Sequence, residues 1–350
     1  MLIYFVMIAL PAMLALFAPR AKSPLYYAAV FTLYVAVIGF RYRVGMDWNN
    51  YDAIHRSLTG QDIGIVFQAA EYSSRFLFWF SANYLSGQVS SNVIGAVAFT
   101  AGLLFVANKT REPWLAVVVA TPFLCVVTAM SATRQSLAIA VIFVLLGLWP
   151  RLGFIARLAL IGVASLFHTS ALALAPIVVG ELRTGLLQKV LLVAVAAGGA
   201  LFLATSSPTF MEQMSAYAEL YTGAQAIVSQ GAFMHVCLVA LPALVYLLNA
   251  RKLQSPFWSK PFLFWSASVA LALLALLPFS SVGAGRLSMY FHYVPMIVVP
   301  LMIDQLGARN TKLSLRLAVI VWQVAFLWVW LTYSNSALAW TNYRSVLMSD

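Results

Sequence analysis

The chain has 350 residues, of which 63% are apolar and only 9% charged, against about 45–50% and about 25% in soluble domains. So few polar groups cannot cover a soluble fold, and the composition excludes a soluble enzyme, a secreted module and a nucleic-acid-binding protein. The net charge of +11 is better explained by loops that stay in the cytoplasm. We therefore expect an all-α, polytopic integral membrane protein.

Apolar runs long enough to cross the hydrocarbon core as helices recur along the chain. They predict about ten full transmembrane helices, at 2–18, 25–40, 91–108, 113–130, 134–149, 187–204, 233–249, 261–279, 287–306 and 315–334. The first run is followed, not preceded, by basic residues, as in a retained span that starts outside. We expect a single transmembrane domain over residues 1–350 with both termini periplasmic.

Two stretches, 64–87 and 153–180, do not fit a simple span. The first is amphipathic and aromatic, and the second is too long for one span and broken around His168. Short loops that carry positive charge stay in the cytoplasm. We therefore expect six loops to be cytoplasmic, at 20–22, 109–111, 151–157, 183–189, 251–260 and 309–316. This topology requires that 64–87 lies on the periplasmic face without crossing. It also makes 153–180 a hairpin of two short helices with His168 near its outer apex.

The predicted topology separates the two kinds of cation. All six lysines fall on the cytoplasmic side, whereas the outer basic residues are all arginines: Arg41, Arg43, Arg56, Arg75, Arg134, Arg286 and Arg344. Arginine suits two-point contacts to phosphate or carboxylate. We therefore expect the chemistry on the outer face, capped by the periplasmic loops 41–63 and 205–232, the second of which has the length of a lid.

The first cluster of candidate site residues follows the second span and comprises Arg41, Arg43, Asp47, Trp48 and Tyr51. Its cations suit phosphate, its aromatic faces suit sugar rings, and its carboxylate can orient or deprotonate a hydroxyl. The alternative is an interfacial aromatic belt with snorkelling arginines.

The second cluster, Ser131 to Ser136, enters the span 134–149. Ser131 or Thr133 can cap this helix, whose N-terminus favours an anion. Arg134 at that position strengthens the case for phosphate, and Gln135 is expected to contact the sugar. The alternative is an arginine that anchors the helix at the membrane interface.

Two further clusters lie later in the chain. His168 at the hairpin apex is a candidate general base, because an ionisable group in a membrane is costly and its pKa suits proton transfer; a packing histidine is the alternative. Arg286, Tyr290 and Tyr293 are spaced i, i+4 and i+7, which predicts one shared helical face. An interfacial tyrosine belt is the alternative for this group.

The sequence lacks the motifs of metal and nucleotide chemistry. It contains no Asp-x-Asp motif, no paired-histidine spacing, no nucleotide-binding loop and no Gly-x-Ser-x-Gly elbow. We therefore expect no metal, no nucleotide and no other cofactor. The substrate must arrive already activated.

Taken in order, four motifs resemble those of the EpsG/Wzy-type bacterial polysaccharide polymerases over residues 41–293. They are R-x-x-x-G-x-D-x-x-x-Y from Arg41 to Tyr51, S-A-T-R-Q-S-L-A, F-H-T-S-A-L and G-R-x-x-x-Y. The resemblance implies an inner-membrane glycosyltransferase of the lipid-linked-sugar class. Its substrate would be an undecaprenyl pyrophosphate-linked oligosaccharide, polymerised on the periplasmic face, with a chain-length regulator as an expected partner. Met46 departs from the pattern, where a small polar residue is commoner.

This resemblance suggests a role for each candidate. Arg134 and Arg286 would stabilise the leaving pyrophosphate with help from Arg41 or Arg43, and His168 or Asp47 would take the acceptor proton. The sugar would be held by Trp48, Tyr51, Gln135, Tyr290 and Tyr293. Alternatives are an O-antigen-ligase-like transfer, a membrane O-acyltransferase, or a transporter of polysaccharide or lipid-linked sugar. A transporter should place polar groups on both sides of the membrane.

Overall fold

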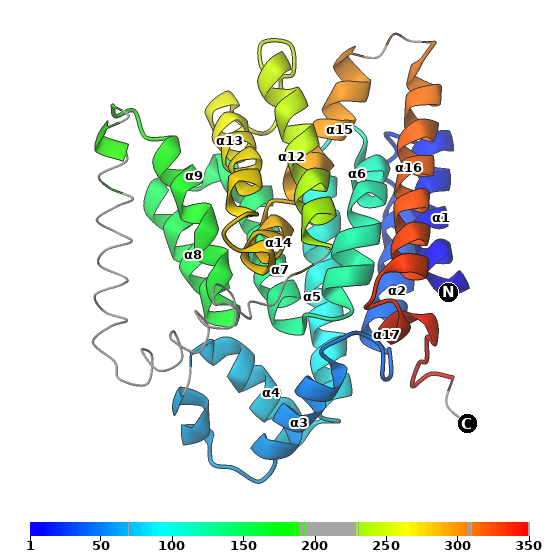
Figure 1. Ribbon diagram of the computed structural model, residues 1–350, viewed down its shortest axis with the longest axis vertical. Helices are drawn as coiled ribbons and strands as arrows, with labels where there is room; N and C mark the ends of the chain where they lie inside the picture. Colours follow the sequence, from blue (N-terminus) through cyan, green and yellow to red (C-terminus); the bar gives the residue numbers. More distant parts are fainter. Residues whose placement is uncertain are drawn as a thin grey trace. The chain divides into compact units, whose positions relative to one another are not determined.

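The computed structural model describes residues 1–68, 70–185, 187–189, 192, 229, 231–306, 308 and 310–348. The predicted span 187–204 and loop 205–232 lie almost wholly outside these residues, as do the last two residues of the chain. The described part is helical throughout, and its one extended pairing is a bridge between Arg41 and Ser345 (Figure 1). The predicted all-α fold is confirmed.

The chain divides into two compact units. Unit 1 comprises Met1–Leu172, Lys252–Phe257 and Pro295–Asp350, and unit 2 comprises Ala173–Arg251 and Trp258–Val294. The single transmembrane domain that we expect from the sequence is not tested by this division.

Unit 1 contains most of the helices. They are α1 (Leu2–Phe17), α2 (Pro24–Gly39), α3 (Trp48–Leu58), α4 (Tyr72–Tyr84), α5 (Gln88–Ala107), α6 (Pro113–Ala120), α7 (Thr133–Leu148), α8 (Phe154–Phe167), α16 (Lys312–Tyr333) and α17 (Leu338–Thr341). Unit 2 holds α9 (Ala175–Gly180), α12 (Ala232–Asn249), α13 (Lys260–Leu276) and α14 (Ser281–Tyr290), and α15 (Tyr293–Leu306) begins in unit 2 and continues in unit 1.

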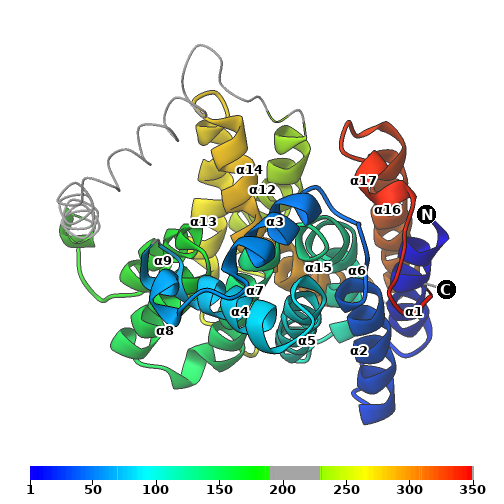
Figure 2. The same ribbon diagram turned by 90° about the horizontal axis from the view of Figure 1, so that it is seen from below.

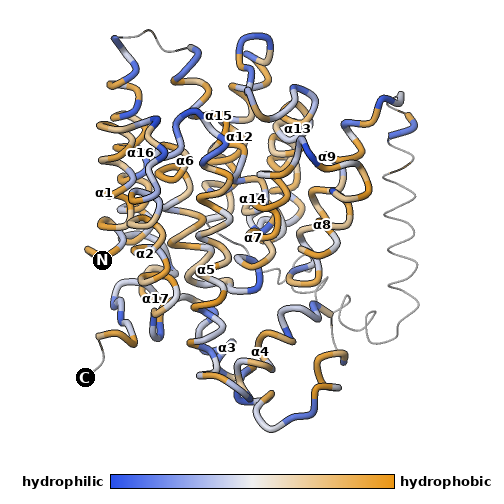
Figure 3. The backbone as a smooth tube through the Cα atoms, turned by 180° about the vertical axis from the view of Figure 1, so that it is seen from behind, coloured by the Kyte–Doolittle hydropathy of each residue, from blue (hydrophilic) through white to orange (hydrophobic). Residues whose placement is uncertain are grey.

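Apolar helices fill the predicted spans wherever those spans fall on described residues. Four of the described helices, α5, α7, α12 and α16, are long and apolar enough to cross a membrane, and the number reaches five if α14 and α15 form one broken span. Others, such as α1, α2 and α8, are apolar but shorter. The predicted number of about ten full spans is therefore not confirmed. Figure 3 shows hydrophobic residues along these helices and hydrophilic ones mainly at their ends.

The centre of unit 1 is α6 and the π-helical turn Thr121–Ala129 that continues it. Its side chains are buried all round, from Trp114 through Met130, and α1, α5 and α16 pack against α6. A helix that is apolar on every side is stable only inside a bundle. The even hydrophobicity of this segment thus explains its central place.

Helices α3 and α4 form a platform at one end of unit 1, beyond the start of α5 (Figures 1 and 2). Its own small core consists of Tyr51, Leu58, Val66, Phe78 and Trp79. The amphipathic segment 64–87 supplies the 3₁₀ helix Ile63–Gln68 and α4. α4 is not among the apolar helices of the described chain, and the location of this segment outside the membrane stays a prediction.

At the opposite end of unit 1, three cations surround one carboxylate. Asp304 pairs with Arg20 at 2.6 Å, with Arg111 at 2.9 Å and with Lys312 at 3.7 Å. These three cations come from three loops predicted to be cytoplasmic. α5 runs from the platform to this end, and its 20 residues span about 30 Å. The predicted cytoplasmic location of these loops stays a prediction.

The predicted break at His168 is present. α8 ends at Phe167, His168 follows in an extended conformation, and the 3₁₀ helix Thr169–Leu174 leads into α9. Because α8 and α9 belong to different units, the reversal of the chain that we expect in this hairpin stays a prediction.

Gly45 packs tightly against the loop that precedes α7, and this contact generates a prediction. Its φ is +100°, and an added Cβ would overlap the Met130 carbonyl oxygen. Gly60 also has positive φ, +75°, but an added Cβ there meets nothing within 4 Å. Gly60→Ala should lower the free energy of unfolding by about 1 kcal/mol, because it places a side chain on a left-handed residue. Gly45→Ala should lower it by at least about 2 kcal/mol, because the new methyl group also overpacks the loop. Thermal unfolding in detergent measures both, and equal losses would contradict the steric explanation.

Candidate functional site

The Glu71 carboxylate is the centre of a hydrogen-bonded network in unit 1. Its Oε2 accepts a bond from Arg134 at 2.8 Å, and its Oε1 lies 2.5 Å from His168 Nδ1 and 3.2 Å from the Thr169 amide nitrogen that donates to it. His168 Nε2 lies 3.1 Å from Gln135 Nε2. The Glu71 and His168 side chains are 10% and 13% exposed, and that of Arg134 is 37% exposed. The network is thus largely buried but reaches the surface at the arginine.

Three helix ends meet at this network. Glu71 precedes the first residue of α4, Arg134 and Gln135 lie in the first turn of α7, and His168 follows the last residue of α8. The Ser74 hydroxyl donates to the Phe167 carbonyl at 2.7 Å, which ties the first turn of α4 to the end of α8. The three helix ends hold the reactive groups together by backbone as well as side-chain contacts.

The backbone of Glu71 is left-handed, with φ 64° and ψ 47°. This conformation is disfavoured for a residue with a side chain by about 1–2 kcal/mol, and such strain is found preferentially at functional sites. The three hydrogen bonds of the carboxylate offset the strain. With this backbone conformation the side chain points toward His168 and Arg134.

The contacts of His168 orient its two ring nitrogens. A carboxylate can only accept, so Nδ1 carries a proton and donates to Glu71. Nε2 faces the side-chain amide of Gln135. Glu71 thus holds one ring nitrogen and leaves the other directed toward α7.

Glu71 is ionised near neutral pH. Burial, the largest single influence, opposes its ionisation, but the hydrogen bond and charge of His168, the charge of Arg134 and the Thr169 amide together hold the pKa of this carboxyl below its ordinary value. An ionised carboxylate on Nδ1 stabilises the imidazolium that forms when Nε2 takes up a proton.

The structure brings the first three sequence clusters together. The Asp47 amide donates to Ser131 Oγ at 3.4 Å. The Arg134 amide donates to the Tyr51 hydroxyl at 3.5 Å, and the Arg134 guanidinium lies 5.9 Å from the centre of the Tyr51 ring. Asp47 directly precedes α3 and is half-buried. These contacts place residues 45–51 beside the start of α7.

The predicted capping of α7 is wrong. The residue before the helix is Ala132, which has no side-chain cap. Ser131 Oγ instead accepts the Asp47 amide, and Thr133 Oγ1 donates to Asn92 at 3.1 Å. Neither hydroxyl faces the free amides of the first turn, because tertiary contacts use both.

Arg41 is buried, with only 2% of its surface exposed. Its guanidinium donates to the Ile38 carbonyl, to Asn92 at 2.9 Å and to Thr133 at 3.2 Å, and burial lowers its pKa to about 10. This placement gives Arg41 a structural role beneath α7, and its predicted contact with pyrophosphate stays a prediction. Arg43 is exposed and lies over the Tyr42 ring at 5.3 Å.

The aromatic residues predicted to bind sugar are packed inside the two units. Trp48 and Tyr51 are 8% and 4% exposed, and Tyr290 and Tyr293 are 2% and 1% exposed. Tyr51 contacts Phe78 in the platform core. These four side chains have packing roles, and their contact with a sugar stays a prediction.

The fourth sequence cluster belongs to unit 2, and the prediction that its three residues share one helical face is wrong. α14 ends at Tyr290, and Tyr293 begins a new helix. Arg286 is exposed on α14, whereas Tyr290 beside it is buried. Periodicity over seven residues assumes a continuous helix, and this segment turns at Phe291.

Glu71 is not among the candidate site residues predicted from the sequence. A carboxylate at the start of an amphipathic helix, in a chain with only 10 acidic residues, is the signal that could have found it. Its partners come from 63 and 97 residues away, so no local motif contains them. The described residues hold no group of three or more metal-ligand side chains, and independence from metal stays a prediction.

Removal of the Glu71 charge should destabilise the protein in a pH-dependent way. Because the pKa of Glu71 is lowered in the folded state, the ionised form adds stability above the ordinary value of 4.5, and this stability is lost as pH falls through the folded pKa. Glu71→Gln should lower the free energy of unfolding by about 1–3 kcal/mol near neutral pH, and the difference from wild type should shrink as pH falls through the lowered pKa of Glu71. The measurement is thermal unfolding in detergent as a function of pH.

The matched control for this prediction is Asp52→Asn. Asp52 pairs with Arg56 on the exposed side of the platform at 2.5 Å, and exposed pairs contribute little. A Glu71→Gln variant as stable as Asp52→Asn at every pH would contradict a central role of the carboxylate.

Comparison with known proteins agrees with the four sequence motifs. A family model described as the EpsG family matches residues 25–345. No curated protein and no solved structure matches the chain. The matched range includes the Glu71 network, the first three clusters and the Arg286 segment. The chain therefore belongs to the EpsG family.

Proposed function

We propose that this membrane protein is a glycosyltransferase that polymerises lipid-linked repeat units, with Glu71, His168 and Arg134 as its reactive centre. The family indicates a polymerase related to exopolysaccharides. The substrate that we propose is an oligosaccharide on undecaprenyl pyrophosphate, presented on the periplasmic face of the inner membrane. The observation that carries the proposal is the chain of contacts from Glu71 through His168 to Gln135, beside Arg134.

His168 is the base in this proposal. In the proposed complex, the hydroxyl of the acceptor sugar replaces Gln135 as the hydrogen-bond partner of His168 Nε2. This nitrogen then takes up the hydroxyl proton. Glu71 holds the ring and stabilises the imidazolium through Nδ1, so it is a positioning residue. This arrangement favours His168 over Asp47, because Glu71 and Gln135 hold the two ring nitrogens of His168 in place beside Arg134.

Arg134 serves the leaving group. The bond between the sugar C1 and the phosphate oxygen breaks, the pyrophosphate leaves with the electron pair, and the acceptor oxygen bonds to C1. A fixed cation aimed at this developing charge is commonly worth several kcal/mol. Arg286 is proposed as a second cation, and a chain-length regulator is a proposed partner.

The role of His168 predicts a large loss of turnover on substitution. His168→Ala should reduce polymer formation by about 10²–10⁴-fold, and Glu71→Gln should lower kcat with little change in KM, because it acts through the ring. The assay follows the ladder of products from a purified lipid-linked repeat. Single additions without a ladder would identify a ligase, and wild-type turnover in both variants would exclude the proposed base.

The role of Arg134 predicts that a positive charge alone at this position does not support activity. Arg134→Ala and Arg134→Lys should both lose most activity, since lysine cannot reproduce a planar two-point phosphate contact. Arg56→Lys is the control, because Arg56 is an exposed arginine of the platform, 78% exposed and paired with Asp52. Full activity of Arg134→Lys in the same assay would reduce Arg134 to a general positive charge.

A further inference from the structure

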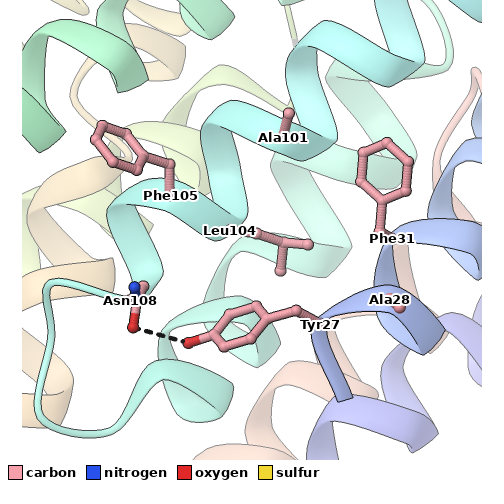
Figure 4. A pocket seen from close by; sticks show the side chains of 7 residues that line it. All are labelled: Tyr27, Ala28, Phe31, Ala101, Leu104, Phe105 and Asn108. Carbon is pink, nitrogen blue, oxygen red and sulfur yellow. Dashed lines mark hydrogen bonds between the residues drawn. The ribbon is translucent and has the colours of Figure 1, made fainter. Parts of the chain in front are cut away.

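The end of unit 1 that is remote from Glu71 has a hollow on its surface, between α2 and α5. Its volume is about 340 Å³. Its walls are apolar and are formed by Ala28, Phe31, Ala101, Leu104 and Phe105 (Figure 4). Ala28 and Ala101 are exposed, so the hollow opens on the outside of the helix bundle. Such a surface faces lipid when α5 crosses the membrane.

One end of the hollow is polar. The Tyr27 hydroxyl donates to Asn108 Oδ1 at 3.1 Å, and both residues line the hollow. Tyr27 belongs to the first turn of α2, and Asn108 follows the last residue of α5. The polar end therefore lies at the level where both helices meet the loops that carry Arg20 and Arg111.

Two ammonium groups border this polar end. Lys22 Nζ donates to the Asn108 carbonyl at 2.5 Å, and Lys109 Nζ lies 4.5 Å from the centre of the Phe105 ring. In the part of the chain that the structure describes, neither lysine forms an ion pair with a carboxylate. Phe105 is also a wall of the hollow, so the cations and the apolar surface are continuous.

The positive charge at this rim is not balanced locally. Burial, followed by the charge of Lys109, lowers the pKa of the Lys22 ammonium. The neighbouring carboxylates are already engaged, Asp304 by three cations and Glu112 by Arg316 at 2.6 Å. An anion placed between the two lysines would relieve their mutual repulsion.

We infer that this hollow is a binding site for an anionic phospholipid of the surrounding bilayer. The phosphate lies between Lys22 and Lys109, and an acyl chain lies along the apolar walls of α2 and α5. Basic pockets between transmembrane helices on the cytoplasmic side bind anionic headgroups in this manner. Apolar walls on the outer surface of the bundle favour a lipid over a free phosphate, and charge complementarity favours an anionic lipid over a zwitterionic one. The inference is independent of the proposed reaction.

The test measures lipid retained by the full-length protein in detergent, by native mass spectrometry. The probes are phosphatidylglycerol and phosphatidylcholine with the same acyl chains. The wild type should retain phosphatidylglycerol preferentially, and the double variant Lys22→Gln, Lys109→Gln should lose this preference by about tenfold. Ala101→Trp fills the hollow and should abolish retention of one bound lipid.

Matched controls separate the site from general effects. Arg151→Gln with Lys252→Gln removes two exposed charges of the predicted cytoplasmic side, and Ala29→Trp adds the same bulk to an exposed position of α2 outside the hollow. Both controls should retain phosphatidylglycerol like the wild type. The inference would be overturned by an equal loss of phosphatidylglycerol in the controls, by equal retention of phosphatidylcholine, or by preferential retention of undecaprenyl phosphate. Displacement of the lipid by millimolar inorganic phosphate would also overturn it.

Discussion

The Glu71 carboxylate is the constraint on which the arrangement of the platform end depends. One side chain, less exposed than its arginine partner, joins the starts of α4 and α7 to the end of α8. A carboxylate in such a place must be paired or protonated, and its partners here keep it ionised. The same contacts that hold three helix ends together therefore also orient an imidazole and a guanidinium toward one surface.

A second buried charge supports this arrangement from below. Arg41 contacts Asn92 on α5 and Thr133 on α7, and the segment around it bonds through its backbone to the C-terminal residues. Gly45 donates to the Ala339 carbonyl, and Val346 donates to the Phe40 carbonyl. The last part of the chain thus closes over residues 40–45, and the loop that precedes α7 packs directly on Gly45. Motif residues that look like ligands in the sequence serve here to hold the start of α7.

The two ends of unit 1 are built for different surroundings. At the platform end, the charged groups of the Glu71 network are paired with one another, and the carboxylate is largely buried. At the opposite end, cations outnumber the carboxylates that they contact, and they border an apolar hollow. Matched, buried charge favours a site with fixed geometry, whereas excess charge at an apolar surface favours contact with a charged membrane.

The sequence by itself determined the helical fold, the helices that fill the predicted spans, the break at His168 and the family, because apolar periodicity and short motifs are local properties. It also singled out Arg134 and His168, since a cation and an imidazole in an apolar chain are conspicuous. Only the tertiary structure decided that Glu71 joins them, that Arg41 is buried, and that Ser131 and Thr133 do not cap α7. It likewise ended α14 before Tyr293. Each of these depends on the turn at Phe291 or on partners far away in the sequence, and a local pattern does not specify which distant groups meet.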